Sequence, residues 1–186
     1  MDEALLLAAA RRSYELGRLR RAGRRAAVAA AVAALPLHHC AQAGRAVEGL
    51  VGIAALATLV ALFTWRGQGY GRGVAPGLVA GVGPLLLPLL SSWTGVLCST
   101  TVCGVLPAAS VLGGLAGGLA LAGSAFGGER GNARRGASYW FAAGAIAASL
   151  GVVGCLHVGL AGLGGMAAGL FVGTLAPLAV RAALAR

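Results

Sequence analysis

The chain has 186 residues, of which 58% are hydrophobic and only 11% are charged, and its mean hydropathy is +0.83. A soluble domain of this length needs many more polar side chains to cover its core, so the composition excludes an ordinary soluble protein. The 15 basic residues, all of them arginine, outnumber the 5 acidic residues and give a net charge of +10, and this combination predicts an all-α, polytopic integral membrane protein.

Residues 1–25 form a basic segment in which leucines recur along one side of a helix and arginines occupy much of the rest. Such a helix lies on anionic lipid at the cytoplasmic surface or docks a cytosolic protein. The acidic residues within the segment argue against a secretory signal. No aromatic or base-reading pattern accompanies the charge, so direct nucleic-acid binding is not expected. The residues expected to contact a partner protein are Leu5, Arg11, Arg12, Leu16 and Leu19.

Six apolar runs follow in the region 26–186, and most are long enough to cross about 30 Å of hydrocarbon. They cover residues 26–40, 46–65, 74–93, 101–126, 138–156 and 158–180. We therefore expect a Gly- and Ala-rich bundle of six transmembrane helices. The first run is short and the last two nearly abut, so four or five spans would follow if one of these segments stayed at an interface.

The arginines give an independent test of this topology, because they collect on the cytoplasmic side of membrane proteins. If six spans alternate in direction, every arginine except Arg45 falls on one side. This pattern predicts a multi-pass protein of the bacterial inner membrane, in contact with the lipid bilayer and with both termini in the cytoplasm.

All four cysteines and all three histidines fall in or beside the three turns on the opposite, outer side. These seven residues are His38, His39, Cys40, Cys98, Cys103, Cys155 and His157. In an oxidising compartment the cysteines are candidates for two disulfides, and the sequence does not choose among the three pairings. Thiolate and imidazole are also ligands for zinc or copper. In the third alternative the cysteines are free and act as small apolar side chains.

Glycines recur at every fourth position in three of the apolar runs, which allows helix backbones to approach closely within hydrocarbon. The expected packing positions are Gly73, Gly77, Gly81, Gly113, Gly117, Gly165, Gly169 and Gly173. Packing within one chain is one use of these stripes, and a homodimer is the other.

An enzymatic function is not expected, because the spans contain almost no ionisable groups. Glu48 is the only acid near a predicted membrane interior, and without a charge at the midplane there is no visible proton relay. No cofactor motif is present either, because the glycine-rich loop RGQGYGRG joins two spans instead of following a strand.

The layout resembles that of bacterial six-helix membrane anti-sigma factors. The likeness lies in the basic N-terminus, in Cys103 followed by Pro107, and in Cys155 and His157 before a glycine-rich last helix. It implies a regulator that holds a sigma factor through Leu5, Leu16 and Leu19 and senses an outer signal through Cys103 and Cys155. The alternatives are a small carrier of a soft metal ion, since such proteins also place paired cysteines in short bundles, and a structural subunit of a larger membrane complex.

Overall fold

The computed structural model describes residues 3–94, 106–126, 136–156 and 159–184. Within these ranges the chain forms seven helices and no strand, which confirms the all-α prediction. Four helical segments are long and apolar enough to cross a membrane, namely Ala46–Arg66, Gly69–Ser91, Ala137–Cys155 and Leu160–Leu184. A fifth apolar stretch, Ala108–Ser124, is shorter.

The first helix, α1, runs without interruption over Glu3–Ala33, so no break marks the expected boundary after residue 25. The run 26–40 does not form one helix, because α1 ends at Ala33 and the short helix α2 covers Leu37–Gln42. Pro36 lies in the turn between them. Proline cannot donate the backbone hydrogen bond that a continuing helix needs, which explains the interruption.

Helices α3 (Ala46–Arg66) and α4 (Gln68–Thr94) form a tight hairpin. One residue, Gly67, joins them with a φ of 64°, a left-handed conformation that favours glycine. Helix α4 remains one helix although it contains three prolines, Pro76, Pro84 and Pro88. The remaining helices are α5 (Leu106–Phe126), α6 (Ala137–Cys155) and α7 (Leu160–Leu184). The helices α3 to α7 therefore coincide, apart from a few terminal residues, with the last five predicted apolar runs.

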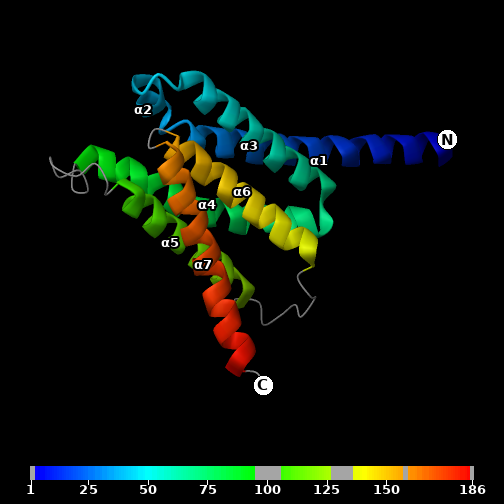
Figure 1. Ribbon diagram of the computed structural model, residues 1–186. Helices are drawn as coiled ribbons and strands as arrows, with labels where there is room; N and C mark the ends of the chain where they lie inside the picture. Colours follow the sequence, from blue (N-terminus) through cyan, green and yellow to red (C-terminus); the bar gives the residue numbers. More distant parts are fainter. Residues whose placement is uncertain (1–2, 95–105, 127–135, 157–158, 185–186) are drawn as a thin grey trace.

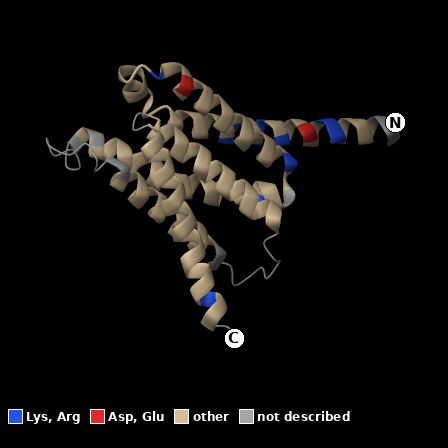
Figure 2. Ribbon diagram, in the orientation of Figure 1, with Lys and Arg blue, Asp and Glu red and all other residues tan. Residues whose placement is uncertain are grey.

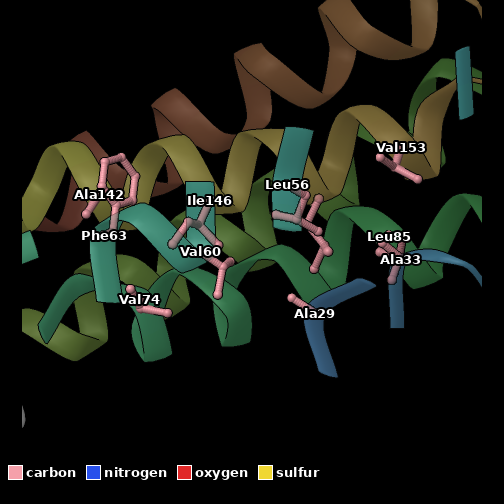
Figure 3. Close-up of a cluster of buried hydrophobic side chains, with 11 residues drawn as sticks. Ala29, Ala33, Leu56, Val60, Phe63, Val74, Leu85, Ala142, Ile146 and Val153 are labelled. Atoms are coloured by element: carbon pink, nitrogen blue, oxygen red, sulfur yellow. The ribbon is translucent and has the colours of Figure 1, made fainter. Parts of the chain in front are cut away.

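The most extensive helix pairs are α5 with α7 and α4 with α6, and α4 also packs on α5. Helix α1 packs mainly on α3, where Ala22, Ala29 and Ala33 are buried. The largest group of buried side chains joins α1, α3, α4 and α6 around Leu56, Ile146 and other apolar residues (Figure 3).

The glycine stripes lie where two helices of this chain approach closely. A Cβ atom added at Gly73 would lie 2.5 Å from the carbonyl oxygen of Tyr139 on α6, and one at Gly77 would lie 2.7 Å from that of Ala143. Five more of the predicted glycines also face a neighbouring helix. Gly81 faces α6, Gly113 and Gly117 face α4, and Gly169 and Gly173 face α5, whereas Gly165 lies half-buried on α7.

The helix ends separate into two groups. Helix α2, the start of α3, and the junction of α6 with α7 lie together at the upper left of Figure 1, whereas the N-terminus is marked at the right and the C-terminus at the bottom. Figure 2 shows most basic residues on α1 and at the right and lower ends of the bundle, with a single one beside α2. The bundle thus has an arginine end and, opposite to it, an end that carries the described cysteines and histidines.

Candidate functional sites

The end opposite the arginines is built around α2, which presents His38 and His39 on neighbouring positions. His38 shares a 3.1 Å hydrogen bond with Gln42, one turn along the same helix. The indole Nε1 of Trp93, near the end of α4, donates a hydrogen bond to Nε2 of His39, and the two ring centroids are 6.0 Å apart. His39 therefore connects α2 to α4.

Cys40 is fully buried between α2 and α3. It packs at Gly49, where an added Cβ would lie 3.4 Å from the Cβ of Cys40. Burial raises the pKa of the Cys40 thiol above its ordinary value; nearby Arg45 partly opposes this shift and Glu48 adds to it. A buried, protonated thiol is a poor nucleophile and a poor metal ligand.

Cys155 is buried at the end of α6 and has a different neighbour. Its sulfur donates to the Ser110 hydroxyl on α5 across 3.6 Å, and both side chains are fully buried. Cys40 and Cys155 are both free. Among the described residues no three histidine, cysteine or acidic side chains lie close enough to hold a metal ion. Three of the seven predicted residues, Cys98, Cys103 and His157, lie outside the described residues.

The structural role of Arg45, at the same end, was not anticipated from the sequence. Its Nη1 donates a 2.8 Å hydrogen bond to the carbonyl oxygen of Leu156, the residue that follows α6. A guanidinium at this position satisfies an unpaired carbonyl and carries the charge that a helix C-terminus favours. The signal in the sequence was the isolation of Arg45, since the alternation of six spans predicts every other arginine on the opposite side.

The second candidate site is the arm, which we define as residues 3–21, the part of α1 before its first buried residue, Ala22. At 1.5 Å per residue the arm is about 28 Å long, and its first turns extend beyond the other helices (Figure 1). Four of the five residues expected to bind a partner, Arg11, Arg12, Leu16 and Leu19, are exposed there. Leu5 lies in α1, with its side chain outside the described part.

Apolar side chains on the arm have little contact with the rest of the chain. Leu7 is 64% exposed, Leu16 49% and Leu19 56%. A shallow depression of about 420 Å³ lies on the arm between Ala8, Ala9, Arg12, Ser13 and Leu16. Exposed leucines beside arginines on a free helix are typical of a surface that binds a second helix or a protein groove.

Comparison with known proteins gives no family for this chain. No protein-family model, no curated protein and no solved structure matches it. The function therefore has to be argued from the chemistry of the two ends and of the arm.

Proposed function

We propose that this protein is a multi-pass regulator in the bacterial inner membrane that holds a cytosolic protein through the arm. The observation that carries the proposal is the exposure of Leu16 and Leu19 on a helix that continues directly into the packed bundle. A partner bound to the arm is thereby joined to the bundle through an uninterrupted helix. The anti-sigma resemblance makes a sigma factor the first partner to test.

The proposal includes six crossings with both termini in the cytoplasm. Five are supplied by α3 to α7. The first is the shortest and comprises residues 22–36, of which the helical part, residues 22–33, rises about 18 Å at 1.5 Å per residue. Arg18 donates a hydrogen bond to the carbonyl oxygen of Trp65 near the end of α3, so both segments reach the same surface. The arginines of the first crossing extend their charged groups toward that surface.

Helix α2 is the element through which an outer signal reaches the arm. It is joined to α1 by the turn at Pro36, to α3 by the packing of Cys40, and to α4 by the hydrogen bond between His39 and Trp93. A ligand or redox change that displaces α2 alters the end of α1 directly. The outer histidines and cysteines are the groups on which such a signal acts.

The test places a photo-crosslinking amino acid at position 16 of the full-length protein in its native cells. We expect crosslinks to one soluble protein, which binds the purified protein in detergent and loses binding in the variant with Leu16→Ala and Leu19→Ala. Truncating two contact leucines in an interface costs roughly 2 kcal/mol or more, about thirtyfold in affinity.

The matched control carries Val47→Ala and Val51→Ala, which remove two exposed apolar side chains at the opposite end of the bundle. This control is expected to bind the soluble protein normally. Crosslinks only to lipid, or equal loss of binding in both variants, would overturn the docking proposal.

A further inference from the structure

A groove of about 600 Å³ lies between α1 and α4, near the arginine end of the bundle. Four arginines of α1, Gly17 and Val28 line it, together with Leu78 of α4. The four arginines are Arg20, Arg21, Arg24 and Arg25. Arg20 and Arg21 belong to the last turn of the arm, but none of the four arginines is among the five residues expected to contact a partner protein, and none lies at the outer end.

The arginines of the groove form two like-charged pairs at i and i+4, Arg20 with Arg24 and Arg21 with Arg25. Such pairs oppose helix formation unless an anion lies between them. All four side chains are exposed, and the structure gives none of them an ion-pair partner among the described residues. Guanidinium groups in this arrangement match phosphate, which accepts several of their N–H donors at once.

Two apolar side chains, Val28 and Leu78, also line the groove. Val28 follows Arg24 by one helical turn and is 62% exposed. Leu78, half-buried against the main core, lies within the apolar segment Gly69–Ser91 of α4 and about 15 Å along α4 from its first residue. The groove therefore combines arginines, which suit a phosphate, with apolar side chains, one of them in a segment long enough to cross a membrane. A phospholipid can contact both groups of side chains, whereas a soluble anion can contact only the arginines.

At its arginine end the groove meets a second cavity, of about 460 Å³, which shares Gly17 and Arg21 with it. A Cβ added at Gly17 would meet no atom within 4 Å, so no other side chain covers this shared lining residue. Arg66 and Thr64 also line the second cavity, and the buried Thr64 hydroxyl has no hydrogen-bond partner in the described part of the chain. The two cavities together have room for a polar headgroup beyond a phosphate.

We propose that this groove is a binding site for an anionic phospholipid of the adjacent leaflet. The phosphate lies among the four arginines, one acyl chain lies on Val28 and Leu78, and the headgroup extends past Gly17 toward Thr64. The inference uses the membrane insertion of the proposed function, but it needs neither a docking partner nor a particular orientation of the termini. Basic pockets between membrane helices are suited to anionic headgroups.

The test is native mass spectrometry of the full-length protein in detergent, titrated with phosphatidylglycerol or with phosphatidylcholine. We expect selective retention of phosphatidylglycerol, reduced about thirtyfold by Arg24→Gln with Arg25→Gln, since each arginine near an anionic lipid surface contributes roughly a fivefold factor. Arg11→Gln with Arg12→Gln removes the same charge from the arm outside the groove and should leave retention unchanged. An equal loss of phosphatidylglycerol retention in both double variants would show that the lipid is held by general charge attraction and not by a specific site, which would overturn the proposal.

A third variant and a competition separate a lipid from a free anion. Val28→Trp fills the apolar part of the groove and keeps all four arginines, so it should abolish phosphatidylglycerol retention. Millimolar inorganic phosphate should not displace the lipid, because phosphate lacks the acyl contacts. Retention unaffected by Val28→Trp, or displacement by inorganic phosphate, would show that the groove takes a soluble anion and would overturn the lipid assignment. Both readouts are independent of whether the arm captures a protein.

Discussion

Replacing Gly118 by alanine should destabilise the bundle, because α5 and α7 approach too closely there for a methyl group. The added Cβ would lie 2.5 Å from the carbonyl oxygen of Leu170 and 2.7 Å from the backbone nitrogen of Thr174. Ordinary contact begins at 3.4 Å, so the two backbones must separate by about 0.9 Å. Overpacking of this kind costs about 1–3 kcal/mol. No flexible side chain lies between the helices to absorb the change.

Gly123→Ala is the matched control on the same helix. Its added Cβ would meet no atom within 4 Å, so only the higher helix propensity of alanine remains, which stabilises by up to about 1 kcal/mol. The measurement is reversible unfolding in mixed micelles, followed by helical circular dichroism as the fraction of sodium dodecyl sulfate rises. We expect Gly118→Ala to unfold at a lower fraction than the wild type, and Gly123→Ala at an equal or higher one. If Gly118→Ala unfolds with the wild type, the close approach of α5 and α7 is incorrect.

Three further predictions concern single interactions. Arg45→Ala removes the 2.8 Å hydrogen bond to Leu156 and should lower the unfolding free energy by about 1–2 kcal/mol in the same micelle assay; an unchanged midpoint would contradict that role. Burial raises the pKa of the Cys40 thiol, so as pH rises this thiol loses its proton in the unfolded chain before it does so in the folded protein. The free energy of unfolding should therefore fall above about pH 8.5 in the wild type and fall less in Cys40→Ala. Identical pH profiles of the two proteins would refute the shift. Tyr139→Phe removes the 2.9 Å hydrogen bond to Ser124 that joins α6 to α5 and should cost about 1 kcal/mol, measured as the change in unfolding midpoint.

The helical elements could be predicted from the sequence because a membrane span leaves a long, simple signal. The apolar runs after residue 45 match α3 to α7 closely, since hydrocarbon thickness sets their length and arginines or glycines mark their ends. The first run was misjudged because hydropathy does not register a helix break. Pro36 is apolar enough to extend the run, yet its missing N–H ends the helix.

The sites were harder to predict because they depend on contacts between distant parts of the chain. The sequence placed Cys40 and Cys155 on the same side, but it did not show that one packs against α3 and the other against α5. The bond from Arg45 to Leu156 joins residues 111 positions apart, and no local pattern encodes it. The arginines of the groove were visible as a basic run, whereas the sequence did not show that Leu78 of α4 lines the same groove.

The geometry of α1 makes the two proposals separable by experiment. Leu19 and Arg24 are five residues apart, so on a regular helix they point about 140° away from each other, and Leu16 lies about 12 Å before Arg24 along the helix. The buried alanines, led by Ala22, occupy a third side of the helix and hold it against α3. Substituting Leu16 and Leu19 should therefore abolish protein capture and spare lipid retention, and substituting Arg24 and Arg25 should do the reverse. If either double variant lost both activities, α1 would act as one undivided surface, and a single anionic partner would have to explain the arginines and the leucines together.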